Sequence, residues 1–411
     1  MFHNILFGIE FSWNELLWMK SIRILFVTRS LPFHGLGGME TVAWDLARAF
    51  SARGHDVAVL TTACPALAAE SVIEGVTIYA IDAPSGRYSR AWWRAAKAFY
   101  RTRLRGHIDI VLSISAGAMS LATSREAIDP ARYFVQAHGT LWGEIASKLA
   151  SVDIKNWAKA LLALKWVPME FGYRRFDGMI TIGPNVTRDA SRYPMRFLLG
   201  PLPLDEIPNG IDTTKFRFDP VMRAEIRARY GLAGDAPVLL ALSRLHNQKG
   251  IQHSLDSFAR AYRRNPALRF VIVGSGPHEA QLRRIATSLQ NEAAVIFAGA
   301  ISREEVPAFY AAADAFIFTT TRVEGLPLNI LEALACGLPV ILSRHIALAD
   351  HRHQYPVDPQ DHDAVAETIG SVLALRPDAK SRTGFLDRGY WLSTAVDRYL
   401  DLFAARLAEL S

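Results

Sequence analysis

Two glutamates, Glu324 and Glu332, lie in the segment whose residue types are best suited to bind a ligand. Gly325 and Pro327 predict a loop after the first glutamate, and a helix is expected to begin near Leu328. A helix N-terminus presents unpaired N–H groups and a partial positive charge, so it can hold a phosphate or a sugar hydroxyl without a metal. Glu324 could accept bonds from sugar hydroxyls, and Glu332 could bind the two hydroxyls of a ribose. Alone, the pair could also be a surface glutamate and a capping glutamate; the surrounding glycines and prolines favour ligand binding.

Two cations, Arg244 and Lys249, follow directly after an apolar run at 237–242 that predicts a buried strand. They are therefore expected at the mouth of a sheet, where a guanidinium fork and a point charge suit a diphosphate. Two solvated surface charges are the alternative. Gly274, after the next predicted strand, would let the backbone approach a ligand closely, although a turn explains a glycine there equally well.

The elements that must position these residues repeat a strand–helix–strand order, which builds doubly wound α/β domains. In the first half, an apolar run at 22–28 precedes a glycine loop at 35–38 and an amphipathic helix over about 40–53. The pattern restarts near residue 236, where a helix is expected over 251–264. The predicted strands span 22–28, 57–61, 108–114, 133–137 and 178–182 in the first half and 237–242, 269–273, 294–297, 315–318 and 339–342 in the second.

A proline-rich stretch near 201–212 separates the two halves. We therefore predict a first Rossmann-like domain over 19–206 and a second over 207–390, followed by a long amphipathic helix within 391–411. Two facing domains leave a cleft between the carboxyl ends of their sheets, where ligands of such folds bind. Residues 1–18 are expected to be a dispensable extension, with an interfacial anchor as the alternative.

In combination, these motifs resemble those of the retaining glycosyltransferase family 4, the large group 1 family with the GT-B fold. The glutamate block and the pair of cations are specific together, whereas the glycine motifs are not. The resemblance implies two Rossmann-like doubly wound domains facing across a cleft, and a C-terminal helix that crosses back to the first domain. It spans nearly the whole chain from Met19, and the matching motifs are Gly37-Gly38-Met39-Glu40, His138-Gly139, the segment 207–212 and the Glu-x7-Glu block.

The resemblance also implies roles for individual residues. Arg244 and Lys249 would bind the donor diphosphate and stabilise the departing nucleoside diphosphate, while Glu324 would bind the sugar and Glu332 the ribose. His138 would contact the donor sugar near the reacting carbon, although a histidine at a strand end more often has no catalytic task. The implied donor site comprises Gly37, Gly38, Arg244, Lys249, Gly274, Glu324, Gly325, Leu326, Pro327, Leu328 and Glu332, and the implied catalytic set comprises His138, Arg244, Lys249 and Glu324.

The implied reaction transfers a sugar from a nucleotide-diphosphate sugar to a hydroxyl acceptor with retention of anomeric configuration, in surface polysaccharide or glycolipid synthesis. The leaving phosphate would take the acceptor proton, and no covalent nucleophile is assigned. No metal and no cofactor besides the donor substrate is expected, because the GT-B family is not metal-dependent. The acidic pair Asp361 and Asp363 precedes an apolar helical run, so we interpret it as a helix N-cap.

Two features leave the substrate and the class of function open. The segment 343–353 stands where the family usually shows Gly-Gly-x-x-Glu, so the identity of the sugar is undetermined. A sugar-nucleotide epimerase of the same fold and a non-catalytic sugar-nucleotide-binding protein are the alternative functions. Only two cysteines, Cys64 and Cys336, occur, which indicates a reducing compartment and therefore a cytoplasmic location.

Positive charge is concentrated in the first half of the chain, since residues 1–200 hold 23 of the 46 Lys and Arg but only 16 of the 40 Asp and Glu. Helical spacing over 88–105 sets a basic sector opposite an aromatic one, which indicates either a solvated face over a core or a contact with anionic lipid. The basic-aromatic segment 157–166 is ambiguous in the same way. We expect a glycan or lipid-linked acceptor and peripheral membrane binding; nucleic acid is not expected, because no motif for it occurs. The basic sector comprises Arg90, Arg94, Lys97, Arg101 and Arg105.

Overall fold

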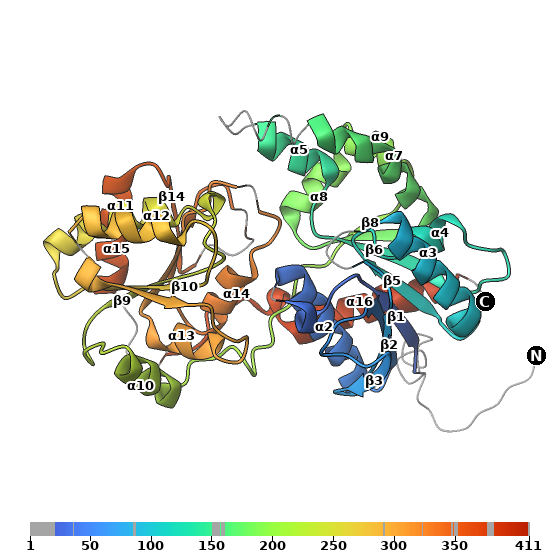
Figure 1. Ribbon diagram of the computed structural model, residues 1–411, viewed down its shortest axis with the longest axis horizontal. Helices are drawn as coiled ribbons and strands as arrows, with labels where there is room; N and C mark the ends of the chain where they lie inside the picture. The colour runs from blue at the N-terminus through green and yellow to red at the C-terminus, as the bar shows by residue number, and fades with distance from the viewer. Residues whose placement is uncertain are drawn as a thin grey trace, which may run out of the picture.

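The structure of the protein is a computed structural model. The proposed extension, residues 1–18, and parts of the segments 157–166 and 343–353 lie outside the described residues. Figure 1 shows two lobes that each contain one sheet with helices around it. The described residues are 21–35, 37–84, 88–149, 157, 161–290, 292–322, 324–346, 348, 352–375 and 382–409.

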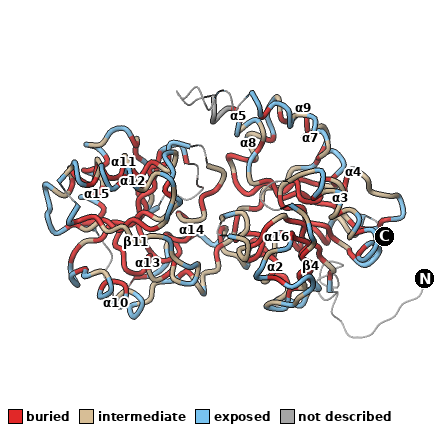
Figure 2. The backbone as a smooth tube through the Cα atoms, viewed as in Figure 1, coloured by how far each residue is buried: buried red, intermediate tan, exposed pale blue. Residues whose placement is uncertain are grey.

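The first lobe is built on an eight-stranded sheet in which every pair is parallel except the β3–β4 edge pair. Its apolar strands are buried on both faces, as parallel strands flanked by helices must be (Figure 2). The strands in spatial order are β3 (Glu70–Ile73), β4 (Val76–Ile81), β2 (Asp56–Thr62), β1 (Arg23–Val27), β5 (Ile110–Ile114), β6 (Arg132–Ala137), β7 (Gly178–Thr181) and β8 (Leu204–Glu206). The helices are α2 (Gly38–Ala52), α3 (Arg90–Phe99), the π-helix η2 (Tyr100–Leu104), α4 (Met119–Thr123), α5 (Leu141–Leu149), α7 (Val167–Glu170), α8 (Pro184–Ser191) and α9 (Met195–Leu199).

The second lobe is built on a six-stranded sheet that is parallel throughout. Strand order changes direction at β9, so the loops after β9 and β12 meet at the carboxyl edge, where open α/β sheets bind ligands. The strands in spatial order are β11 (Val295–Gly299), β10 (Arg269–Val273), β9 (Val238–Leu242), β12 (Ala315–Phe318), β13 (Val340–Ser343) and β14 (Gln354–Val357). The helices are α10 (Pro220–Arg229), the 3-10 turn η5 (Asn247–Lys249), α11 (Ile251–Arg264), α12 (Glu279–Ser288), α13 (Val306–Ala312), α14 (Leu328–Ala335) and α15 (His362–Ala374).

The chain passes between the lobes twice, and the two passages are bonded to each other. Ile211 on the outward passage forms a parallel bridge with Trp391 on the return. The Ile211 N–H donates to the Tyr390 carbonyl, and the Leu392 N–H donates to the Ile211 carbonyl, each at 2.9 Å. The last helix, α16 (Leu392–Ala408), then packs against α2 of the first lobe (Figure 1). The expected pair of doubly wound domains with a C-terminal helix crossing back is therefore confirmed.

Candidate active site

A cavity of about 780 Å³ lies between the lobes, at the carboxyl ends of both sheets. It is lined from the first lobe by His138 and by residues of α5, α7 and α8, and from the second by Gln248, Arg322, Glu324 and Gly325. The two walls are close together, because the Asn185 side-chain amide donates to the Glu324 carbonyl at 3.2 Å. A Cβ atom added to Gly325 would lie 2.9 Å from the His138 carbonyl oxygen, so a larger residue there would push the lobes apart. The predicted site residues His138, Glu324 and Gly325 thus share one cavity.

The Glu324 carboxylate, whose residue lines the cavity, forms an ion pair of 2.8 Å with the Lys249 ammonium. The Thr320 hydroxyl also donates to Glu324, at 3.2 Å, and the ammonium lies over the Phe318 ring. Lys249 ends the turn η5, and Gly250 follows it with a φ of +73°. Any side chain at 250 would collide with the Thr319 carbonyl, so this glycine lets the lysine loop pack directly on the exit of β12.

Helix α14 points its N-terminus at the same corner of the cleft. It begins at Leu328 after the extended residue Pro327, as the sequence predicts. The Asn329 amide donates to the Leu242 carbonyl at 2.9 Å, which ties the first turn of α14 to the end of β9. Leu326 is buried beneath the loop. The free N–H groups of this turn therefore face the side of the sheet that carries Arg244 and Lys249.

The second glutamate of the motif, Glu332, is 1% exposed and its carboxylate is held from two sides. The Tyr310 hydroxyl donates to Oε2 at 3.0 Å, and the Arg303 guanidinium lies 2.5 Å from Oε1. Burial lowers the pKa of Arg303, but the charge and hydrogen bond of Glu332 outweigh it, so the pKa is raised overall. Glu332 is turned into the protein interior, where Arg303 and Tyr310 contact its two oxygens, and it is not among the described residues that line the cavity. Its contact with a ribose stays a prediction.

His138 follows β6 and is fixed by a chain of buried hydrogen bonds. Its Nε2 lies 2.8 Å from the Gln136 side-chain oxygen, and the Gln136 amide donates to the Tyr399 hydroxyl of α16 at 2.7 Å. Burial lowers the pKa of His138 to about 4, so the imidazole is neutral near pH 7. With Gln136 accepting at Nε2, that nitrogen carries the proton and Nδ1 is left as an acceptor.

The other predicted site residues, including Lys249 and Glu332, are not among the described residues that line the cavity. Arg244 is exposed and has no side-chain partner among the described residues. Gly274 has a φ of +130°, and a Cβ there would lie 2.0 Å from the Ser243 carbonyl, so the loops after β9 and β10 require glycine for their contact. A Cβ atom added to Gly37 would collide with the Glu40 carboxylate, and one added to Gly38 would lie 3.7 Å from the Leu328 side chain of the other lobe.

Two family models match the chain, one on each lobe. The model described as Glycosyltransferase Family 4 matches residues 36–215, and the model described as Glycosyl transferases group 1 matches residues 222–385. The chain belongs to the group 1 glycosyltransferases of family 4. The family resemblance seen in the motifs is confirmed.

Curated relatives are similar to parts of the chain. The chain is 38% identical, over 50% of its length and 56% of the relative's, to a GDP-mannose-dependent alpha-(1-6)-phosphatidylinositol monomannoside mannosyltransferase of Mycolicibacterium smegmatis. It is 36% identical, over 33% of its length and 31% of the relative's, to the alpha-monoglucosyldiacylglycerol synthase of Streptococcus pneumoniae. The matched segment spans little more than half the length of the mycobacterial relatives.

The GT-B fold is shared with solved structures of low sequence identity. A glycosyltransferase from Rickettsia africae superposes with a TM-score of 0.69 at 15% identity, over 95% of this chain and 100% of that one. Sucrose-phosphate synthase from Thermosynechococcus elongatus superposes with a TM-score of 0.67 at 21% identity, over 95% and 98%.

In this family member, the acidic pair near residue 362 has a structural role. Asp361 accepts a hydrogen bond from the Ala364 N–H at 3.1 Å, so the N-cap interpretation is confirmed. Asp363 forms an ion pair with Arg260 of α11. Within the described residues, no group of three or more His, Cys, Asp or Glu side chains is arranged to hold a metal ion.

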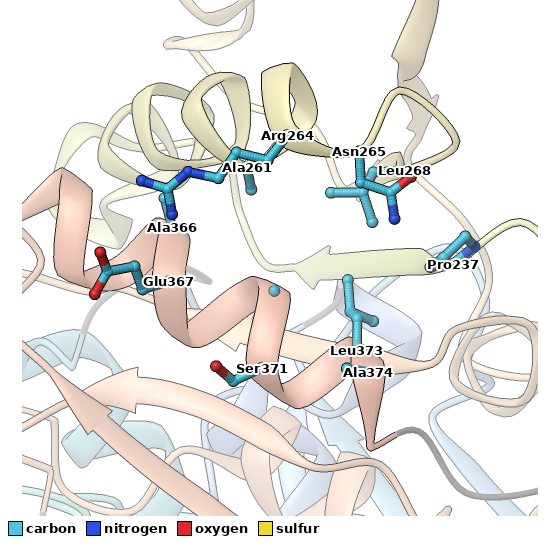
Figure 3. A pocket seen from close by; sticks show the side chains of 11 residues that line it. Pro237, Ala261, Arg264, Asn265, Leu268, Ala366, Glu367, Ser371, Leu373 and Ala374 are labelled. Carbon is cyan, nitrogen blue, oxygen red and sulfur yellow. The ribbon is translucent and has the colours of Figure 1, made fainter.

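A second hollow, of about 650 Å³, lies on the outer side of the second lobe between α11 and α15 (Figure 3). It includes Pro237, which directly precedes β9, so it sits at the amino edge of the sheet. The site residues are at the opposite, carboxyl edge. This hollow is therefore separate from the candidate active site.

The basic segment 88–105 is anchored by its aromatic side. Trp92 of α3 is fully buried and its indole N–H donates to the Gly117 carbonyl at 3.0 Å. Arg101 and Arg105 both form ion pairs of 2.5 Å with Glu126. This arrangement favours the interpretation of a solvated basic face over a core.

An apolar surface lies instead on the neighbouring elements of the first lobe. We call it the 161–197 surface. Phe171 and Phe197 form an edge-on ring pair with centroids 6.3 Å apart, and the Lys165 and Arg174 cations lie over Trp166 and Phe171. The 3-10 turn Phe171–Arg175, which carries Phe171, packs against α9, which carries Phe197. Among the described helices none is long and apolar enough to cross a bilayer. The surface consists of the side chains of Leu161, Leu162, Leu164, Trp166, Phe171, Tyr193 and Phe197, which are 39–82% exposed.

Three functional candidates escaped the sequence-based prediction. Arg303, which precedes α13, and Tyr310, which lies in α13, contact Glu332 of α14. No motif in the sequence connects these two residues with Glu332. Glu170 is a buried carboxylate of the cavity wall, 6% exposed. A glutamate within an aromatic-rich helical stretch could have signalled it, but burial of one face cannot be read from such a short helix.

Proposed function

We propose that this protein transfers a sugar from a nucleoside-diphosphate sugar to a hydroxyl acceptor, with retention of configuration. One observation carries the proposal: Glu324, which precedes the N-terminus of α14 and is paired with Lys249, shares a cavity with His138 of the other lobe. A cation, a carboxylate and free helix N–H groups at one corner suit a diphosphate joined to a polyol.

The proposed chemistry is electrostatic. Breaking the anomeric bond places negative charge on the diphosphate, which Lys249, the unpaired Arg244 and the α14 N–H groups would stabilise. Glu324 and the neutral His138 would hold the sugar hydroxyls, and the diphosphate oxygen would take the acceptor proton as the acceptor attacks from the same face. Glu332 would bind the ribose, with Arg303 adjusting its position. These roles need no metal and no protein nucleophile.

We propose GDP-mannose as the first donor to test and a glycolipid as the acceptor. The names of the mycobacterial relatives specify GDP-mannose and a phosphatidylinositol monomannoside, and that of the pneumococcal relative specifies a glucosyl-diacylglycerol product. The exposed 161–197 surface, with its flanking cations, supports a place for the enzyme at the cytoplasmic face of an anionic membrane.

The donor site is tested by thermal unfolding with GDP-mannose, UDP-glucose and ADP-glucose. A true donor at 100 times its Kd should stabilise the fold by about 2.7 kcal/mol. Lys249→Ala should abolish that stabilisation and lower turnover by about 10²- to 10³-fold. Arg283→Ala, which breaks an exposed ion pair of the same lobe, is the matched control and should leave both unchanged. Normal turnover in the Lys249 variant would refute the assignment.

Membrane binding is tested by co-sedimentation with vesicles of phosphatidylglycerol and phosphatidylcholine at low and high salt. Leu162→Ser combined with Phe197→Ser should weaken binding by at least about tenfold, since each exposed apolar side chain contributes roughly 1.5–3 kcal/mol when buried. Leu375→Ser removes an equally exposed leucine of the other lobe and should have no effect. Equal losses for both variants would exclude the 161–197 surface as the contact.

A further inference from the structure

The first-lobe wall of the cavity contains a buried carboxylate, that of Glu170. Glu170 ends α7, is 6% exposed and lines the cavity. Its side chain has no hydrogen-bond or ion-pair partner among the described residues. Among the described residues, no opposite charge offsets the cost of burying this carboxylate. Burial therefore raises the pKa of Glu170 to about 7. A buried carboxylate without a partner lowers the stability of the fold, and such groups are typical of ligand-binding sites.

Aromatic side chains line the same cavity as this carboxylate. Residues 164–175 form consecutive helical turns, so Trp166, four residues before Glu170, and Tyr173, three residues after it, share its face. All three line the cavity, together with Tyr88 and Trp93. The Trp93 indole N–H donates to the Ala116 carbonyl at 2.9 Å, which fixes the ring. A carboxylate for hydroxyls and flat apolar rings for C–H faces are the groups that suit a polyhydroxylated ring.

The charge of the wall selects the type of acceptor. Asp189 and Arg29 also line the cavity, and the Arg29 guanidinium lies over the Tyr88 ring. The carboxylates of Glu170 and Asp189 would repel a phosphate placed between them. An uncharged sugar or cyclitol ring would instead donate its hydroxyls to these oxygens. Trp166 belongs both to the cavity and to the 161–197 surface, so a lipid chain attached to the ring has an apolar route out of the cavity.

We propose that Glu170 is the acceptor-binding carboxylate, which receives the hydroxyls of an uncharged sugar or cyclitol ring packed against Trp93 and Trp166. This inference rests on the proposed function, because it assigns the acceptor half of the same cavity. It places the acceptor ring against the first lobe, while the donor is held by the second lobe together with His138.

The experiment measures binding to the full chain by isothermal titration and by ligand-observed saturation-transfer NMR. The probes are methyl α-D-mannopyranoside, octyl α-D-mannopyranoside below its micelle concentration, and inorganic phosphate. Glu170→Gln keeps the size of the side chain and removes its charge, so it should fold. It should weaken octyl mannoside binding by about ten- to a hundredfold, because a charge-assisted hydrogen bond is lost. Asp82→Asn, an exposed carboxylate of the same lobe, is the control and should bind as the wild type does.

Comparison of the probes distinguishes the possible outcomes. If both mannosides need Glu170 and the octyl form binds more tightly, the acceptor ring is lipid-linked; if they bind equally, it is a free glycan, and both results support the carboxylate. Unchanged mannoside binding in Glu170→Gln, or competition by phosphate, would overturn the inference. Stabilisation by GDP-mannose is measured in parallel and should persist in the variant. If GDP-mannose does not stabilise the wild type, that result counts against the proposed function and not against the role of Glu170.

Discussion

At the residue scale, the Glu332 carboxylate is the most enclosed charge of the site. Arg303 and Tyr310 compensate it, and Arg303 itself lies over the Phe216 ring. Removing one member of a buried ion pair leaves the other charge without compensation, which typically costs about 3–5 kcal/mol. Such a cost is a large part of the stability of any domain.

Arg303→Ala should therefore lower the free energy of unfolding by about 3–5 kcal/mol, measured by urea denaturation at pH 7. Arg229→Ala removes an exposed arginine paired with Glu305 and should cost less than about 1 kcal/mol. Comparable losses in the two variants would show that the Glu332 charge is solvated rather than buried.

Glu170 predicts a specific pH dependence of stability. Burial raises the pKa of Glu170 from 4.5 to about 7 in the folded protein, so the folded state keeps its proton over a range in which the unfolded state releases it. The stabilising contribution is complete below pH 4.5 and is lost as the pH rises to 7, which amounts to about 3 kcal/mol. Tyr173 and Tyr88, the titratable groups beside it, keep their protons there, because burial raises the pKa of each.

The measurement is chemical denaturation of the wild type and of Glu170→Gln between pH 4.5 and 8. Relative to the variant, the wild type should lose about 3 kcal/mol over this interval. Parallel curves for the two proteins would mean that the Glu170 carboxylate titrates normally.

The residue types of the donor corner could be predicted from the sequence, but their pairing could not. Glu324 and Lys249 were each identified from a local motif, yet their contact depends on the loops after β9 and β12 meeting at one edge. Arg303 and Glu170 lie in segments with no recognisable spacing. Their importance follows from burial and from missing or matched partners, which only tertiary packing determines.

At the element scale, α16 reaches the reaction centre through one hydroxyl. Tyr399 is 1% exposed and accepts a hydrogen bond from Gln136, which in turn orients His138. Without that hydroxyl, the buried Gln136 amide loses its acceptor, at a cost of about 1–3 kcal/mol, and the amide is free to turn away from the imidazole.

Tyr399→Phe should lower kcat by about tenfold, equivalent to about 1.4 kcal/mol, with little change in the KM for the donor. Phe403→Leu provides the control, since Phe403 is buried on the same helix and packs on Phe134 without a polar contact. It should reduce stability and leave kcat near that of the wild type. A similar fall of kcat in both variants would indicate general loosening of α16 rather than positioning of His138.

Long, regular elements were predictable and short edge elements were not. The helix over 251–264 and the strand over 269–273 have the predicted bounds, because each combines a clear period with a sharp boundary. Strands β3, β4, β8 and β14, at or next to the sheet edges, have no counterpart among the predicted strands. β3 and β4 alternate in burial, β8 has three residues and β14 contains a proline, so none shows the apolar run of a central parallel strand.

At the scale of the whole molecule, the site depends on two lobes held at a fixed distance by the paired passages of the chain. The division into two sheets follows from the sequence, but contacts between lobes do not, because they join residues from separate motifs. The approach of Gly325 to the His138 carbonyl and that of Gly210 to Leu392 are examples. At both places the absence of a side chain decides how near the lobes come.

Gly210→Ala should loosen this junction. An added Cβ would lie 2.5 Å from the Leu392 Cα and 2.9 Å from its nitrogen, which are backbone atoms, so one passage must shift. We expect a loss of stability of about 1–3 kcal/mol. Hydrogen exchange of the Ile211 and Leu392 amides, which bond across the two passages, should become faster. Gly234→Ala, at a position with open space around it, should change neither quantity. If the two variants behave alike, the paired passages do not hold the lobes in register, and the distance across the cleft must be set by the Asn185–Glu324 contact instead.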